Sequence, residues 1–158
     1  MNPFEDFKTY FAQVASEHLE IKTFVHGDVR RFQAKSRSEM EYPCLWLETP
    51  NQKFVDNTGN TFIESTGAFV ILHNAPAGDA EGQDQIWSDT NEIALDIIAR
   101  IRKDSRDKTK FIGCSNFSID PVDTLFVAND YGWRVEFTVK KSWSLCFNPM
   151  RWLADLFT

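Results

Sequence analysis

The residues of this sequence that could support covalent chemistry are three cysteines and three histidines. A nucleophile needs a base within hydrogen-bonding reach and a third group that orients the base. Cys44 with His26 or His73 is the one pair that neighbouring strands could bring together. Neither histidine stands in a local sequence typical of a cysteine-nucleophile family, and a buried structural cysteine is far more common. We therefore predict that this chain is not an enzyme and has no catalytic residues.

Two patterns could hold a cation. His26-x-Asp28 could meet His73 across paired strands, but there is no tight spacing such as His-x-x-x-His, and a histidine at a strand end usually makes an ordinary hydrogen bond. The acidic stretch 79–84 resembles part of a calcium loop, yet it lacks the bidentate glutamate that ends such loops. Acids at the start of a helix explain it better. We predict no metal site and no cofactor.

Several function classes are disfavoured by composition. The sequence contains neither a glycine-rich phosphate loop nor a nucleophile elbow. Its net charge is −6, whereas a dedicated nucleic-acid binder has a basic domain, so we predict no sequence-specific nucleic-acid partner. No apolar run approaches the roughly 18 residues of a membrane span, and the acidic start is unlike a signal peptide. We expect a cytoplasmic chain without a membrane partner.

The length of 158 residues predicts one domain, and 42% hydrophobic with 25% charged residues is ordinary for a globular protein. The cysteines Cys44, Cys114 and Cys146 are isolated in apolar, strand-like contexts. We therefore predict that all three are reduced residues of the core.

The centre of the predicted fold is a strand followed by a long helix. Residues 67–73 are apolar on both faces, which favours a strand in the middle of a covered sheet. Turn residues follow, and a helix is predicted over residues 82–103. Its apolar stripe comprises Ile86, Thr90, Ile93, Ala94, Ile97, Ile98 and Ile101. This stripe should lie across the sheet.

A second helix is predicted over residues 2–19, with Asn2 as its cap and Pro3 in its first position. Further strands are expected at 21–25, 42–47, 111–119, 124–128 and 133–140, with a hairpin built from 53–55 and 61–64 and a turn at 129–132. Residues 29–40 could be a short helix or a loop. The resulting fold class is α+β: a single domain whose antiparallel or mixed sheet carries the long helix and the N-terminal helix.

Charge is strongly polarised along the chain. From Phe54 to Ala99 there are eight acids and no Lys or Arg, whereas bases crowd residues 100–110. This pattern can be a solvated face that matches the helix dipole. It can also be a head-to-tail contact between identical subunits. The residues proposed for that contact are Asp79, Glu81, Asp84, Asp89, Arg100, Arg102, Arg106 and Lys108.

The chain ends in an aromatic, amphipathic segment at residues 150–158, after a helix-start signal at Asn148-Pro149. Its apolar surface should dock, either on its own domain or on a partner subunit. The candidate docking residues are Trp152, Leu153, Leu156 and Phe157.

The order of these elements, with the Tyr42-Pro43 strand and the Gly132-Trp133 hairpin, resembles the tail-terminator and tail-completion proteins of tailed phages and phage-like contractile systems. The resemblance covers most of the chain. It implies a subunit without catalytic residues that forms a ring, often a hexamer. Such a ring ends the tail tube and joins it to the connector, so its partners are copies of itself, tube proteins and connector proteins. Its expected location is the cytoplasm during assembly and then the virion or particle.

A different class of function remains open. The chain could be a binding module for a small molecule or protein, with a cleft between sheet and helix. Trp87, Trp133 and Trp143 are the candidate lining.

Overall fold

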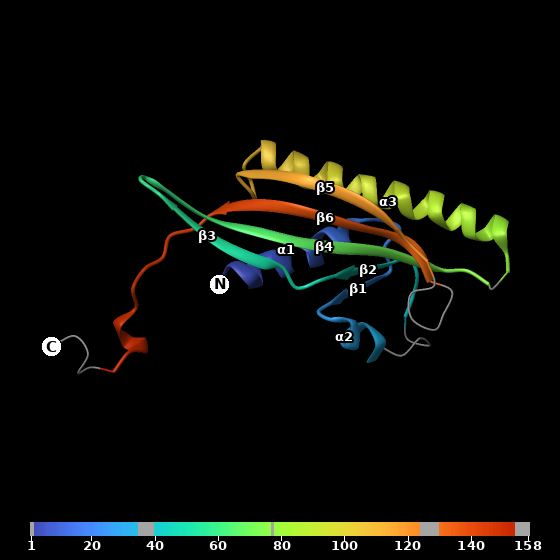
Figure 1. Ribbon diagram of the computed structural model, residues 1–158, viewed down its shortest axis with the longest axis horizontal. Helices are drawn as coiled ribbons and strands as arrows, with labels where there is room; N and C mark the ends of the chain where they lie inside the picture. The colour runs from blue at the N-terminus through green and yellow to red at the C-terminus, as the bar shows by residue number, and fades with distance from the viewer. Residues whose placement is uncertain (1, 35–39, 77, 124–129, 154–158) are drawn as a thin grey trace.

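The computed structural model describes residues 2–34, 40–76, 78–123 and 130–153. Its elements are α1 (Pro3–Glu17), β1 (Thr23–His26), α2 (Val29–Ala34), β2 (Cys44–Leu47), β3 (Asn51–Asn57), β4 (Asn60–Asn74), α3 (Ala80–Arg106), β5 (Gly113–Val122), β6 (Asp130–Ser142) and a 3-10 turn at Pro149–Arg151. Figure 1 shows the long helix α3 running along the sheet, with α2 on the opposite side. The strand predicted at 124–128 lies outside the described residues.

The six strands form one mixed sheet in the order β1-β2-β4-β6-β5, and β3 pairs with the first half of β4. Only β1 and β2 run parallel; the other pairs are antiparallel. β4 is therefore the central strand, and it pairs with β6 from Phe62 to Asn74. The predicted α+β class with a mixed sheet is confirmed.

The two faces of the sheet carry separate apolar clusters. The larger cluster joins α1 and α3 to the sheet through aromatic and branched residues, including Phe11, Phe69, Ile97 and Phe137. The smaller one packs Phe32 of α2 against Trp46 and Leu72 on the opposite face. Because β4 lies between both clusters, its residues 68–72 are all buried, as their two-sided apolar pattern predicts.

Both predicted helices are present, with shifted ends. The Asn2 side chain accepts a hydrogen bond from the Glu5 amide at 2.8 Å, which confirms the predicted cap of α1. Asp79 caps α3 in the same way, accepting from the Gly82 amide at 3.0 Å. The acid is therefore the cap itself, which is why the helix begins before residue 82. The open question at 29–40 is settled in part, since 29–34 form α2 and Asp28 accepts from the Arg31 amide at 3.0 Å.

The sequence predicts a turn at residues 129–132. This prediction is wrong for residues 130–132, the part of the turn that the structure describes. Asp130, Tyr131 and Gly132 belong to β6 and pair with β4. Gly132 is required there by space, because a Cβ atom on it would lie 1.8 Å from the carbonyl oxygen of Ile71. The sequence signal of a turn glycine thus marks a close approach of two strands.

Replacing Gly132 by alanine is expected to lower the free energy of unfolding by about 1–3 kcal/mol, because the added methyl group must push two paired strands apart. The matched control is Gly113→Ala in β5, where the nearest atom is a flexible Lys140 side-chain carbon at 4.0 Å. Chemical denaturation of both variants measures the difference. Equal stabilities would contradict the close approach of Gly132 to β4.

Candidate functional site

The solvent-facing side of α3 carries separated charges. The helix has 27 residues and is therefore about 40 Å long. Exposed acids occupy its first part: Asp79, Glu81, Asp84, Asp89, Glu92 and Asp96. Exposed bases occupy its end and the following loop: Arg102, Lys103, Arg106, Lys108 and Lys110. Figure 1 shows the helix running straight along the sheet, so its acidic and basic ends lie far apart within one chain.

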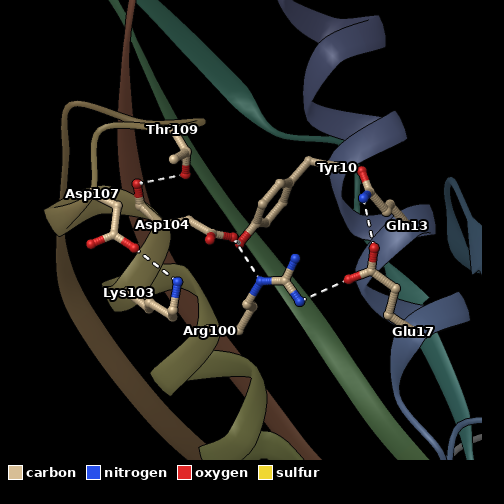
Figure 2. Close-up of polar contacts among 8 residues, drawn as sticks. All are labelled: Tyr10, Gln13, Glu17, Arg100, Lys103, Asp104, Asp107 and Thr109. Atoms are coloured by element: carbon tan, nitrogen blue, oxygen red, sulfur yellow. Dashed lines mark hydrogen bonds and ion pairs between the residues drawn. The ribbon is translucent and has the colours of Figure 1, made fainter.

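Arg100, one of the four bases predicted to contact another subunit, forms its ion pairs within its own chain. Its Nη1 lies 2.8 Å from Glu17 Oε2 on α1, and its Nε lies 2.9 Å from Asp104 Oδ2 on its own helix. Figure 2 shows the guanidinium between these two carboxylates. Hydrogen bonds from Gln13 and Arg100 hold the pKa of Glu17 below its usual range, and the contact with Glu17 raises the pKa of Arg100. Arg100 therefore ties α3 to α1.

Asp104 is the organising residue of this network, and the sequence reasoning missed it. Its Oδ2 also accepts a hydrogen bond from the Tyr10 hydroxyl at 2.9 Å, and both residues are buried. Burial, reinforced by the bond to Asp104, raises the pKa of Tyr10 well above its ordinary range. A signal was available, since Asp104 follows Ile97 and Ile101 at helical spacing. An acid on an apolar stripe needs a buried partner.

The other three predicted bases have a different environment. Arg102, Arg106 and Lys108 are exposed, and none of them forms an ion pair with another described residue. Lys103 does, at 2.8 Å from Asp107. The acids at the opposite end are equally exposed, although Asp79 caps the helix and Asp89 accepts from Gln85 at 2.8 Å. Three bases and several acids are thus available for contact with another molecule.

The last described part of the chain projects from the domain. We call residues 143–153 the C-terminal arm. It begins where the Trp143 amide donates to the Thr61 carbonyl at 3.2 Å and the Thr61 hydroxyl donates to the Trp143 carbonyl at 2.7 Å. Figure 1 shows it running away from the sheet. β4 begins at Asn60, so within the described residues β4 gives the arm no pairing partner beyond this point.

The arm exposes five large apolar side chains. Their exposed fractions are 68% for Leu145, 60% for Phe147, 93% for Met150, 56% for Trp152 and 75% for Leu153. Docking of this segment on its own domain is therefore wrong for the described residues, because the arm leaves the sheet where its pairing partner ends. Leu156 and Phe157 lie outside the described residues. The alternative, docking on a partner subunit, stays a prediction.

A small pocket of about 160 Å³ opens beside the root of the arm. We call it the α1 pocket, because α1 forms one wall; β4, β6 and the segment after α3 form the others. Buried Phe7, Ile63 and Val139 supply the apolar part of its lining, and the Asp6–Lys141 ion pair and the buried Ser65 also line it. Thr9, Gln13 and Lys110 form an exposed polar rim. It is a cleft between helix and sheet, but with a different lining from the predicted one.

The three tryptophans proposed as the lining of a cleft do not come together. Trp133 Nε1 donates to the Trp87 carbonyl at 2.8 Å, and the Trp87 ring meets Tyr131 edge-on at 5.4 Å. These two tryptophans therefore pack between α3 and one end of β6. Trp143 follows the opposite end of that strand.

Cys44 and the two histidines considered for chemistry lie on the neighbouring strands β1, β2 and β4, and Cys44 pairs with Leu72, the residue before His73. Cys44 is completely buried. His26 pairs with Leu47 and Thr23 with Cys44, so three residue steps, roughly 10 Å, separate the histidine from the cysteine along the strands. His73 stacks on Tyr42, and its Nδ1 lies 3.0 Å from the Asn74 carbonyl. Among the described residues no three histidine, cysteine or acidic side chains are grouped as metal ligands.

The thiols should differ sharply in reactivity. Cys44 is buried and Cys114 half-buried, but Cys146 on the arm is exposed, so the prediction of three core cysteines is wrong for Cys146. An exposed thiol reacts freely, whereas a buried thiol reacts only after the surrounding structure has unfolded. We expect Cys146 to react with a chromogenic disulfide reagent at once and Cys44 only under denaturing conditions. Cys146→Ser should remove the fast phase. A fast thiol that persists in a Cys114→Ser/Cys146→Ser variant would indicate a reactive Cys44.

No helix in the described part of the chain combines the length and apolar character that crossing a membrane demands. Comparison of the chain with models of known protein families and with curated proteins found no match.

Proposed function

We propose that this chain is a structural subunit that assembles with copies of itself into a ring, of the kind that ends a phage-like tail tube and joins it to the connector. The observation that carries the proposal is the separation of exposed charge along α3. Each copy presents an acidic surface at one end of the helix, and at the other end three bases, Arg102, Arg106 and Lys108, that form no ion pair with a described residue. Neither set is neutralised by the other within the described chain.

Such a surface favours contact between copies. When the acidic end of one subunit meets the basic end of the next, the two contacting surfaces are different, and the arrangement is heterologous. A heterologous contact closes into a ring where the rotation between subunits permits. Charge complementarity also sets the register and speeds association. In the proposed contact, Arg102, Arg106 and Lys108 of one copy face Asp84 and Asp89 of the next.

The assignment to a phage-like tail rests on the resemblance in element order. Its partners are then further copies, tail-tube proteins and connector proteins, and its final location is the particle. A net charge of −6 suits a ring through which DNA passes, because a protein of negative net charge repels the DNA backbone. No catalytic step belongs to this function.

A binding module is the second candidate, and the α1 pocket is the observation that favours it. A volume of about 160 Å³ holds one ring-sized group rather than a drug-sized ligand, since sites for such ligands measure roughly 300–1,000 Å³. The pocket therefore suits a single side chain better than a free metabolite.

Electron microscopy of the purified protein tests the proposal. At high protein concentration and low salt we expect closed rings of uniform diameter with a central opening. Open filaments would show that the contact is heterologous but does not close. Single particles of subunit size at every concentration would contradict ring formation by the chain alone.

A further inference from the structure

The C-terminal arm and the α1 pocket are chemically matched. The arm carries the five exposed apolar side chains described above, in a stretch with only one charged residue, Arg151. Aromatic side chains such as Phe147 and Trp152 bury roughly 150–250 Å² each, a substantial part of the roughly 800 Å² that each partner buries in a standard interface, and the three other exposed side chains add to this area. Apolar surface of this extent marks an interaction site.

The pocket has the size and chemistry to receive part of the arm. Its volume of about 160 Å³ is close to the roughly 150 Å³ at which a cavity admits one benzene-sized ring. Phe7, Ile63 and Val139 supply apolar contact at the floor. Lys110 at the rim is exposed and forms no ion pair with a described residue, so it can donate to backbone carbonyls of an extended segment.

We propose that the C-terminal arm of one copy docks in the α1 pocket of a second copy. The root of the arm is fixed by the two hydrogen bonds between Trp143 and Thr61, and from there the arm runs away from its own domain (Figure 1). Every copy thus presents an arm and a pocket at the same time. Exchange of the arm around a ring places one ring-sized side chain of each arm against the apolar residues of the neighbouring pocket.

This inference rests on the proposed function and adds to it a second contact between neighbouring subunits. The charged contact along α3 sets the orientation and on-rate, whereas the arm supplies apolar burial. The two contacts predict different salt responses. Salt screens the charges, but it leaves or strengthens the apolar contact.

Disulfide cross-linking tests the docking directly, because Cys146 is an exposed thiol on the arm. One protein keeps Cys146 and carries Cys114→Ser. A second carries Thr9→Cys or Gln13→Cys at the pocket rim, together with Cys114→Ser and Cys146→Ser. After mixing and mild oxidation we expect a dimer linked between the rim position and Cys146. Ser88→Cys, on the exposed start of α3, is the control partner and should give little dimer.

Cross-linking at the rim that does not exceed the Ser88→Cys control overturns the proposal. A combined Thr9→Cys/Cys114→Ser variant that retains Cys146 identifies the source of the arm. If it forms a disulfide only within one chain, the arm belongs to its own pocket, and the proposal is again overturned.

Substitution of the arm gives an independent measurement. In Leu145→Ser/Phe147→Ser/Trp152→Ser, which removes both exposed ring-bearing side chains of the arm, we expect the concentration of half-assembly to rise at least about tenfold, because large apolar contacts are lost. The control is Leu19→Ser/Leu95→Ser, which removes exposed apolar side chains outside the arm. It should change the concentration of half-assembly little. If the arm variant forms rings at the wild-type concentration, the proposed docking of the arm is wrong, but the proposed assembly into a ring is not contradicted. If the wild-type protein neither assembles nor cross-links, both proposals fail.

Discussion

Asp104→Ala is expected to lower the free energy of unfolding by about 2–3 kcal/mol. The Asp104 carboxylate accepts hydrogen bonds from the Tyr10 hydroxyl and from Arg100 Nε, both at 2.9 Å. Truncation leaves the buried hydroxyl without this acceptor and removes one polar link between α1 and α3, although the Arg100–Glu17 ion pair can still join the two helices. A buried polar group without a partner costs more than the bond itself contributes. Chemical denaturation, followed by circular dichroism, measures the loss.

Asp107→Ala is the matched control for this variant. Asp107 forms the same type of i,i+4 pair, with Lys103 at 2.8 Å, but both side chains are about half exposed or more. Exposed pairs contribute about 0.2–1 kcal/mol. Tyr10→Phe combined with Asp104→Ala should recover part of the loss, because the stranded hydroxyl is gone. Equal effects of Asp104→Ala and Asp107→Ala would contradict the organising role of Asp104.

Reversal of three bases, Arg102→Glu/Arg106→Glu/Lys108→Glu, is expected to weaken assembly at least about a hundredfold at low salt. Like charges across a contact cost several kcal/mol, and tenfold in affinity corresponds to about 1.4 kcal/mol. The three side chains are exposed and form no ion pair with a described residue, so the fold should be retained. Sedimentation or light scattering measures the change.

The control for the charge reversal changes the net charge equally at other exposed bases, in Lys22→Glu/Arg30→Glu/Lys53→Glu. Assembly of this control should stay close to that of the wild type. Adding Asp84→Lys and Asp89→Lys to the first variant restores opposite charges across the contact and should recover assembly. If the reversal variant assembles as the wild type does at both low and high salt, the α3 contact is wrong.

The main elements could be predicted because their signals are local. The apolar stripe of α3 follows helical spacing over many residues, and the two-sided apolar run of β4 indicates a strand buried on both faces. The Asn2 cap is likewise a short-range pattern. Each of these signals lies within one stretch of sequence, so no knowledge of distant contacts is needed.

The parts that could not be predicted depend on contacts between distant residues. Asp104 accepts a hydrogen bond from Tyr10, a residue 94 positions away. The sequence around Asp104 does not indicate which residue this partner is. From the sequence alone, Gly132 resembles a turn glycine. Its actual role, the close approach of β4, becomes visible only when the two strands are paired. The course of the C-terminal arm depends on where β4 begins, at Asn60. An amphipathic composition indicates that a segment docks, but it does not indicate on which chain.

The mass of the purified protein in solution, measured by light scattering across protein concentration and salt, tests the central claim most directly. We predict a discrete multiple of the 18.3 kDa subunit that persists over a range of concentration and dissociates partly as salt rises. The Arg102→Glu/Arg106→Glu/Lys108→Glu variant should have a lower mass under the same conditions. A mass of 18.3 kDa at every concentration and salt would contradict self-assembly through the polarised surface of α3.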